Sequence, residues 1–336
     1  MGTSIFLYLN HYDYRLSWLC SSESAKLEAQ RLFSKKMTSK LHCGVLSEEE
    51  YTLKMAQTVI TEKLPDLKDC DLIIEAIPED LELKRKMFMH LDQIVKTDCI
   101  FTTNSSSILP SQLFPSEGRK NKTIGLHFFF PVQLKKFVEL ITTAQSSSLV
   151  KEKLHHFLEE IQKIPFCQDE NHSFILNRLF LDFQAGAYQI YEEGRLSYKE
   201  IDDLVKEHLF PFGVFEFFDH VGIDVMLASV RAYTDDALNQ DFYAPLVAKM
   251  EELARLRHLG IKTKQGFYDY STPTKNQTLA MVKDELQEPY HREVAERLRN
   301  YFLNSVKTVL ESGFITADEL AEAIKDYTGM DKDPFI

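Results

Sequence analysis

The stretch DLIIEAIPEDLELKRKMFMHLDQIVKTDCIFTT, residues 71–103, decides the fold. Its pattern predicts an apolar strand over Asp71–Ile77, an amphipathic helix over Leu81–Val95 and a second strand over Cys99–Thr103. Three more strands are predicted downstream, over Thr123–Phe128, Phe137–Ile141 and Pro165–Gln168, with a helix over Ser148–Gln162 before the last. Since strands that alternate with helices are typical of a mostly parallel sheet, this part of the chain is predicted to be α/β.

The residues before this stretch predict a strand followed by a helical hairpin. Tyr14–Cys20 alternates as a strand, and Ser22–Lys36 has helical spacing. Ser47 and Glu50 have the spacing of a capping box that opens another helix. We therefore expect a helical hairpin insertion at about residues 22–58.

The strand signal ends near residue 170, and helical patterns take over from Phe174. We place the domain boundary at Asp169–Ser173. Breaks are expected at Pro211–Gly213, Gly222 and Gly260–Tyr270. The second domain is therefore predicted to be all-α.

An internal repeat is visible in the helical part. Residues 191–205 and 310–324 each contain a glycine followed by a new capping box, Ser197 with Glu200 or Thr316 with Glu319. The tail over residues 272–336 is therefore predicted to be a partial second copy of the helical unit. The alternative is a chance similarity between two amphipathic helix pairs.

Bulk properties narrow the functional classes. The chain has 336 residues, 44% of them hydrophobic, and a formal net charge of -12, which argues against nucleic-acid binding. No apolar run approaches the roughly 20 residues that span a bilayer, so no membrane partner is expected. The five cysteines have no C-x-x-C spacing and are expected to be buried, reduced thiols. The protein is therefore expected to be cytoplasmic. No metal site is predicted.

Residues suited to acid/base chemistry follow two neighbouring predicted strands. His127 lies near the end of one strand, Ser106 follows another, and Glu139 lies downstream. A histidine can take a hydroxyl proton while a carboxylate fixes its tautomer. The competing interpretation is that His127 merely ends a buried strand and Glu139 lies on an exposed edge.

Several separate blocks resemble one family in order and spacing. They are Asp71–Lys84, Asn104–Ser107, Gly125–Pro131 (GLHFFFP), Asn177–Leu179, Pro211–Gly213 with Glu216 and Asp219–Gly222, and Gly260–Tyr270. From Gly2 to about Ser271 the chain resembles the L-3-hydroxyacyl-CoA dehydrogenase family. The resemblance implies a Rossmann-like NAD-binding domain over residues 1–170 and an all-α substrate or dimerisation domain over residues 171–271.

The resemblance also implies an activity and a set of site residues. The activity is hydride transfer between C3 of an (S)-3-hydroxyacyl-CoA and NAD, in fatty-acid or short-chain acyl-CoA metabolism. His127 is then the acid/base and Glu139 its partner, while Ser106 and Asn177 contact the substrate. The positions that touch or border the cofactor are Glu79, Lys84, Asn104, Lys262 and Gly2.

The sequence departs from the family pattern at four places. Gly2 fits the third glycine of the G-x-G-x-x-G fingerprint, so the first strand of the sheet and two glycines are expected to be absent, which exposes two strand edges. Cys20 stands where the family has the acidic residue that holds the adenosine ribose. Phe130 replaces an asparagine beside the catalytic histidine, and His172-Ser173 replaces Pro-Gly.

These departures leave alternatives open. The chain is a truncated or misassigned reading frame of a working enzyme, a weakly active paralogue, or a non-catalytic member that binds acyl-CoA or a protein partner. A related dehydrogenase that acts on a free hydroxy acid is a further alternative. The oligomeric state is expected to be either a homodimer or a monomer completed by its own C-terminal repeat.

Overall fold

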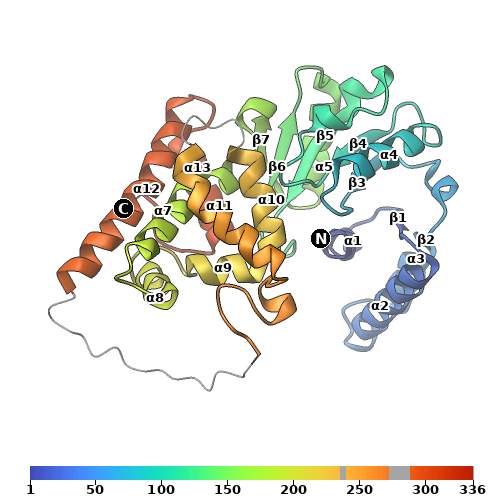
Figure 1. Cartoon of the computed structure of the whole chain (residues 1–336). Coiled ribbons are helices and arrows are strands. Elements are labelled where there is room, and N and C mark those ends of the chain that lie inside the picture. The colour runs from blue at the N-terminus through green and yellow to red at the C-terminus, as the bar shows by residue number, and fades with distance from the viewer. Residues whose placement is uncertain (235–239, 272–287, 336) are drawn as a thin grey trace. The chain divides into compact units, whose positions relative to one another are not determined.

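The computed structural model describes residues 1–234, 240–271 and 288–335. The chain divides into two compact units, Met1–Ser173 and Phe174–Ile336 (Figure 1).

A five-stranded sheet forms the centre of the first unit. Its strands lie in chain order and are β3 (Leu72–Glu75), β4 (Ile100–Thr103), β5 (Thr123–Phe128), β6 (Phe137–Thr142) and β7 (Ile164–Asp169). Neighbouring strands are parallel except β5 and β6, which are antiparallel. The predicted mostly parallel sheet is therefore confirmed, with one antiparallel pair in it.

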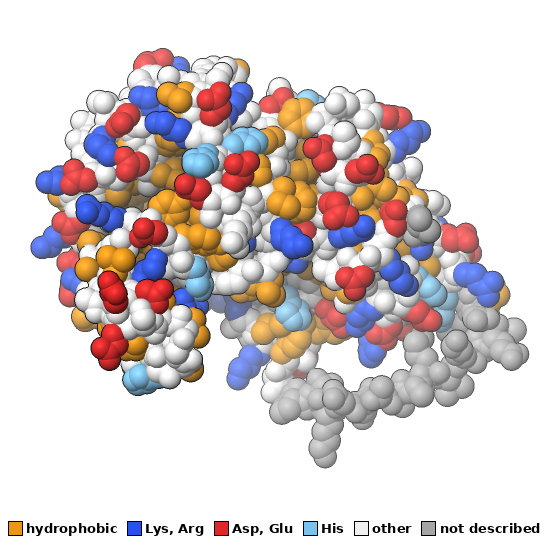
Figure 2. All heavy atoms as spheres, turned by 180° about the vertical axis from the view of Figure 1, so that it is seen from behind, with side chains coloured by type: hydrophobic (Ala, Val, Ile, Leu, Met, Phe, Trp, Pro, Cys, Tyr) orange, Lys and Arg blue, Asp and Glu red, His pale blue; other side chains and the backbone are white. Residues whose placement is uncertain are grey.

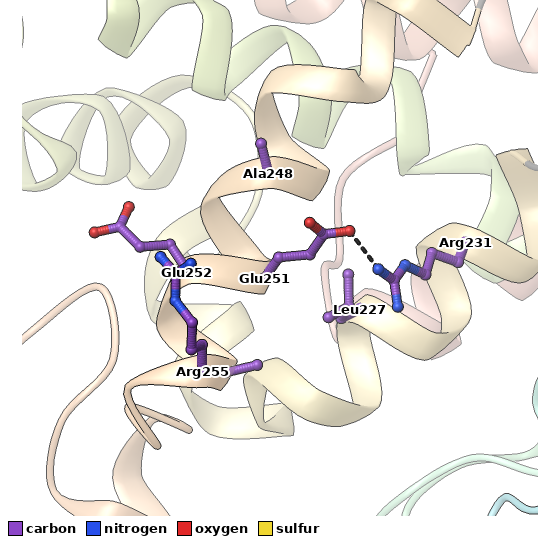
Figure 3. Close-up of a pocket in the computed structure, with 7 residues that line it drawn as sticks. Leu227, Arg231, Ala248, Glu251, Glu252 and Arg255 are labelled. Atoms are coloured by element: carbon purple, nitrogen blue, oxygen red, sulfur yellow. Dashed lines mark hydrogen bonds and ion pairs between the residues drawn. The ribbon is translucent and has the colours of Figure 1, made fainter.

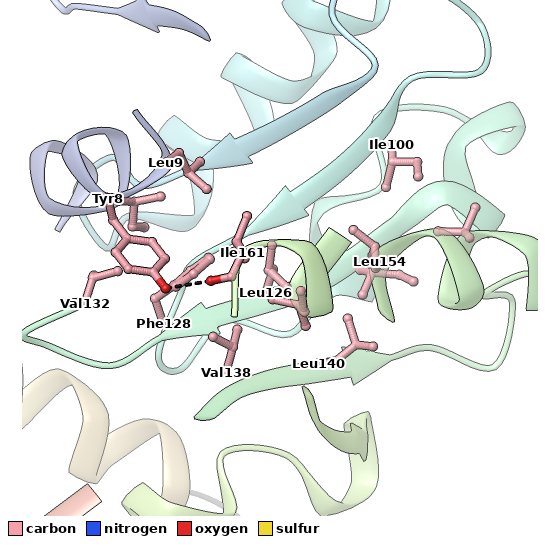
Figure 4. Packing of buried hydrophobic residues seen from close by; sticks show 14 residues of the cluster. Tyr8, Leu9, Ile100, Leu126, Phe128, Val132, Val138, Leu140, Leu154 and Ile161 are labelled. Atoms are coloured by element: carbon pink, nitrogen blue, oxygen red, sulfur yellow. Dashed lines mark hydrogen bonds between the residues drawn. The ribbon is translucent and has the colours of Figure 1, made fainter. Parts of the chain in front are cut away.

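Helices cover both faces of this sheet because successive strand residues point to opposite sides. In β4, Ile100 packs with residues of α1 (Gly2–Leu9) and α5 (Ser148–Glu160), whereas Phe101 packs with residues of α4 (Leu81–Asp92). In the first cluster the Tyr8 hydroxyl donates a hydrogen bond to the Ile161 carbonyl at 2.6 Å (Figure 4). The alternation of apolar residues thus produces the two covered faces of a Rossmann-like sheet.

A second, two-stranded sheet pairs β1 (Leu16–Leu19) with β2 (Thr58–Thr61) in parallel. Between these strands lies the predicted helical hairpin, α2 (Glu23–His42) and α3 (Glu48–Ala56), and Ser47 and Glu50 form the expected capping box. Across residues 1–173, all of them described, no hydrogen-bonded strand joins β1 to β3. β1 and β3 are therefore both edge strands, as expected where a first strand between them is absent.

The second unit is helical throughout its described parts, apart from isolated bridges at Gly260, Gln265 and Asp269. Its helices are α6 (Ile175–Leu179), α7 (Leu181–Glu192), α8 (Tyr198–His208), α9 (Val214–Val221), α10 (Ile223–Thr234), α11 (Gln240–Arg255), α12 (Glu288–Glu311) and α13 (Ala317–Thr328). Helices end at the predicted breaks, and Gly222 has a φ of 104° at the end of α9.

Two buried carboxylates organise the turns around α9. Asp202 accepts hydrogen bonds from the backbone N–H groups of Phe215 and Glu216, so it caps the start of α9. Burial raises the pKa of Asp202 to about 6, although these bonds act in the opposite direction. Asp219 likewise accepts from the backbone of Phe267 and Tyr268, which fixes the loop before Tyr270.

The two segments of the predicted repeat share local geometry. Gly194 and Gly313 have φ values of 76° and 68°, and each is followed by a complete capping box. Residues 272–287 of the predicted second copy lie outside the described residues, and the copy itself stays a prediction.

The surface carries both signs of charge, and acidic and basic side chains are interspersed on the face in Figure 2. Of the described helices, none is both long and apolar enough to cross a membrane. The expectation that the cysteines are buried is wrong for Cys43 and Cys167, which are exposed. Cys43 follows the end of α2, and Cys167 points outward from the edge strand β7.

Candidate active site

The antiparallel pairing of β5 and β6 brings His127 and Glu139 together. The two residues are directly opposite in the register, which places their side chains on one face of the sheet. His127 Nδ1 lies 2.7 Å from Glu139 Oε2, and the side chains are 7% and 0% exposed. The competing interpretation of Glu139 as an exposed edge residue is therefore wrong. With Nδ1 bonded to the carboxylate, Nε2 is the nitrogen suited to proton exchange with a substrate.

The second oxygen of Glu139 is also bonded. Gln168, buried in β7, donates from Nε2 to Glu139 Oε1 at 2.9 Å. The edge of the Phe129 ring packs against the imidazole, with centroids 4.8 Å apart. The dyad is thus held on two sides by side chains to which the sequence interpretation gave no role.

Asn104 ties the ends of two strands together beside the histidine. Its Oδ1 accepts a hydrogen bond from the backbone N–H of Phe128 at 2.9 Å. Asn104 follows β4 directly, and Phe128 follows His127 in β5. The predicted cofactor residue Asn104 therefore lies close to the dyad, at the carboxyl edge of the sheet where α/β proteins bind ligands.

A buried ion pair supports the same edge. Lys84 lies 2.8 Å from Glu75 Oε1, with side chains 1% and 2% exposed, and 3.1 Å from Glu79 Oε2. Thr103 donates to Glu75 Oε2 at 2.6 Å, which links β3 to β4. The ammonium of Lys84 is thus held inside the protein, where it fixes the loop between β3 and α4.

Glu79 anchors the serine loop that contains Ser106. Its Oε1 accepts hydrogen bonds from the hydroxyls of Ser105 and Ser107, the latter at 2.7 Å. Burial raises the pKa of Glu79, but the Lys84 ammonium and the two hydroxyls outweigh burial and hold it below its usual value. Ser106 lies between the two anchored serines, so its backbone is held on both sides.

Three further positions of the first unit, Gly2, Cys20 and Phe130, bear on the binding of the expected NAD cofactor. At the start of α1, Gly2 lies against the end of β3, where a Cβ on it would be 3.5 Å from the Ala76 Cβ. Cys20 is buried at the end of β1, and a thiol is a weak acceptor for two ribose hydroxyls. Phe130, by contrast, is 69% exposed. The thiol of Cys20 thus does not fit the adenosine half of NAD as an acidic side chain would.

Asn177 and Lys262 belong to the second unit. Asn177 lies on α6 and bonds to Tyr233 and Tyr327, each at 3.2 Å. Lys262 forms an ion pair with Asp224. These two predicted residues are therefore in a different unit from His127, Glu139, Ser106, Asn104, Glu79, Lys84 and Gly2.

A cavity of about 400 Å³ lies between α10 and α11 in the second unit. Figure 3 shows Arg231 and Glu251 joined across it by an ion pair. None of the predicted site residues lines this cavity. The described residues contain no group of three or more His, Cys, Asp or Glu side chains that could hold a metal ion.

A Rossmann-like unit with a buried His–Glu pair near the carboxyl edge of its sheet, followed by a helical unit, is consistent with the class of nicotinamide-dependent dehydrogenases. Residues 1–171 match the family model described as 3-hydroxyacyl-CoA dehydrogenase, NAD binding domain, and residues 174–270 match that of the C-terminal domain. The chain belongs to the 3-hydroxyacyl-CoA dehydrogenase family. Its function class is thus that of an NAD-dependent oxidoreductase of hydroxyacyl-CoA substrates.

Individual relatives agree with this assignment. The 3-hydroxybutyryl-CoA dehydrogenase of Clostridioides difficile is 38% identical over 215 residues, 63% of this chain and 75% of that protein. The mitochondrial hydroxyacyl-coenzyme A dehydrogenase of Mus musculus is 31% identical over 251 residues, 74% of this chain and 79% of that protein. The structure of (S)-3-hydroxybutyryl-CoA dehydrogenase from Ralstonia eutropha matches with a TM-score of 0.71 and 27% identity, and covers 81% of this chain and 96% of that one.

Proposed function

We propose that His127 is the acid/base and Glu139 its partner in hydride transfer between C3 of an (S)-3-hydroxyacyl-CoA and NAD. The observation that carries this proposal is the buried contact of 2.7 Å between His127 Nδ1 and Glu139 Oε2. A buried carboxylate favours the imidazolium that forms when the histidine takes a proton.

The proposed step begins with the substrate hydroxyl near Nε2 of His127. As C3 becomes a ketone, Nε2 takes the hydroxyl proton and Glu139 stabilises the resulting positive charge through Nδ1. The chemistry that NAD supplies when bound is acceptance of the hydride that leaves C3. Ser106 hydrogen-bonds the reacting oxygen, and Asn177 contacts the thioester end.

We propose that four residues border the cofactor directly and that a fifth, Lys84, acts indirectly. Asn104, Glu79, Gly2 and Lys262 would border the cofactor. Lys84 acts through its ion pair with Glu75, because that pair holds the loop between β3 and α4 in place.

The proposal is tested by NADH oxidation in the presence of acetoacetyl-CoA. We expect turnover by the wild type and a kcat lower by about 10²- to 10⁴-fold for His127→Gln, since general acid/base catalysis contributes that much. His156→Gln is the matched control, because His156 is 73% exposed. Equal kcat values for the wild type and His127→Gln would refute the proposal.

Two observations favour a second function. In the described residues 1–173 no strand joins β1 to β3, and Cys20 stands where the family has the acidic residue that holds the adenosine ribose. In this alternative the chain binds acyl-CoA or a protein partner without redox chemistry. Calorimetric titration with NADH and with CoA separates the two proposals. Binding of CoA without binding of NADH would support the alternative, and tight NADH binding would count against it.

We place the proposed enzyme in fatty-acid oxidation or short-chain acyl-CoA metabolism, in the cytoplasm. For the assembly, both a homodimer and a monomer completed by α12 and α13 agree with the proposal. Analytical ultracentrifugation of the full chain distinguishes them.

A further inference from the structure

The amide of Asn177 is held by hydroxyl groups from two different helices. Its Nδ2 donates a hydrogen bond to the Tyr233 hydroxyl on α10 at 3.2 Å. Its Oδ1 accepts one from the Tyr327 hydroxyl on α13, also at 3.2 Å. Tyr327 lies beyond residue 270, where the match to the C-terminal domain model ends.

The rings that carry these hydroxyls are themselves fixed. Tyr327 stacks on Phe180, with centroids 5.5 Å apart and an interplanar angle of 30°. The Tyr233 ring contacts Phe174 at 6.0 Å, and the Arg178 guanidinium lies 5.9 Å from its centroid. Because two-torsion aromatic side chains lose little entropy when packed, the hydroxyls are rigid partners for the amide.

The two hydrogen bonds hold the Asn177 amide at both of its ends. An asparagine amide has two N–H donors on nitrogen and an acceptor oxygen. In the structure the Tyr327 hydroxyl donates to the amide oxygen, and the Tyr233 hydroxyl accepts one N–H. Within residues 1–234, 240–271 and 288–335, no hydrogen bond is made by the second N–H.

We propose that Tyr327 is a positioning residue of the acyl-thioester site and acts through Asn177. Its hydroxyl bonds the carbonyl oxygen of the amide and so holds the Asn177 side chain in place, with the second N–H left to bond the thioester oxygen of the substrate. This inference rests on the proposed function, in which Asn177 contacts that end of the substrate. It assigns a role to the C-terminal helices, which otherwise only cover the second unit.

Local sequence places Tyr327 on the correct side of α13. The capping box of Thr316 and Glu319 starts the helix, and Gly329 ends it with a φ of 76°. Leu320, Ile324 and Thr328 form the buried stripe at helical spacing, and Tyr327 lies beside it. Packing of this stripe in the second unit therefore directs the Tyr327 hydroxyl toward α6.

The test compares acetoacetyl-CoA with CoA, which lacks the thioester, by calorimetric titration of the full chain. For Tyr327→Phe, which keeps the ring, we expect the Kd of acetoacetyl-CoA to rise about five- to tenfold and that of CoA to change by less than twofold. In an Asn177→Ala background the same substitution should have no further effect. Tyr290→Phe is the matched control on α12, since the Tyr290 hydroxyl bonds to Glu193 at 3.3 Å and, among the described residues, makes no hydrogen bond with Asn177.

Three outcomes would overturn the inference. They are an unchanged Kd for acetoacetyl-CoA, an equal loss for both ligands, and an effect that persists in the Asn177→Ala background. If the wild type binds neither ligand, the proposed function fails together with the inference. If the wild type binds acetoacetyl-CoA and oxidises NADH but Tyr327→Phe behaves as the wild type, only the inference fails.

Discussion

Buried polar side chains connect His127 to residues that are distant in the chain. The contact between His127 and Glu139 is consistent with the pairing that the family resemblance predicted from sequence. Gln168 was not predicted, because a glutamine in a short strand has the same pattern whether it faces solvent or the core. Only the pairing of β7 with β6 determines that the Gln168 side chain points toward Glu139.

Gln168→Leu should lower kcat for acetoacetyl-CoA reduction by about tenfold and leave KM within about twofold. The substitution removes one hydrogen bond to a buried carboxylate, and such bonds contribute about 1.5 to 3 kcal/mol. Steady-state NADH oxidation measures the change, with the exposed Gln93→Leu as control. A kcat no lower than that of the control would show that Gln168 does not support the dyad.

Glu79→Gln should reduce stability most at neutral pH. The pKa of Glu79 is lowered in the fold, so its ionised form stabilises the folded state above its unfolded pKa. This contribution is lost as the pH falls through the lowered folded pKa. We therefore expect the difference in unfolding free energy between wild type and variant to shrink from pH 7 toward pH 3 in denaturant titrations. A difference independent of pH would contradict this assignment.

At the scale of elements, strand and helix positions were predictable but strand pairing was not. The predicted strand over Thr123–Phe128 has the bounds of β5, because a run of apolar and β-branched residues is sufficient to indicate a strand. That β5 and β6 are antiparallel depends on contacts remote from either strand. The strand β2 was missed, since its four residues begin at Thr58, where the predicted hairpin ends.

Gly125→Ala tests the close packing of β5 against its neighbours. A Cβ at Gly125 would lie 2.8 Å from the Ile141 Cβ and 3.3 Å from the Pro110 Cγ. Because these atoms belong to a strand core and a rigid ring, we expect a loss of about 1 to 3 kcal/mol in unfolding free energy. Gly118→Ala is the control, since a Cβ there meets no atom within 4 Å. Equal stability of the two variants in thermal denaturation would contradict the prediction.

At the scale of the whole molecule, the chain combines the buried His127–Glu139 pair with strands that are divided between two separate sheets. The Rossmann-like and all-α character of the two units followed from periodicity and resemblance. The contacts of α12 and α13 could not be predicted from the sequence, because helical spacing indicates an apolar face but not what that face contacts. The account therefore depends on whether this combination still transfers a hydride.

Mass spectrometry of the product formed with NADH deuterated at both C4 positions tests that claim most directly. With acetoacetyl-CoA and the wild type, the account predicts 3-hydroxybutyryl-CoA carrying one deuterium at C3. With His127→Gln, formation of this product should fall by about 10²- to 10⁴-fold. Absence of labelled product from a wild type that binds both NADH and acetoacetyl-CoA, or equal labelling by His127→Gln, would contradict the account.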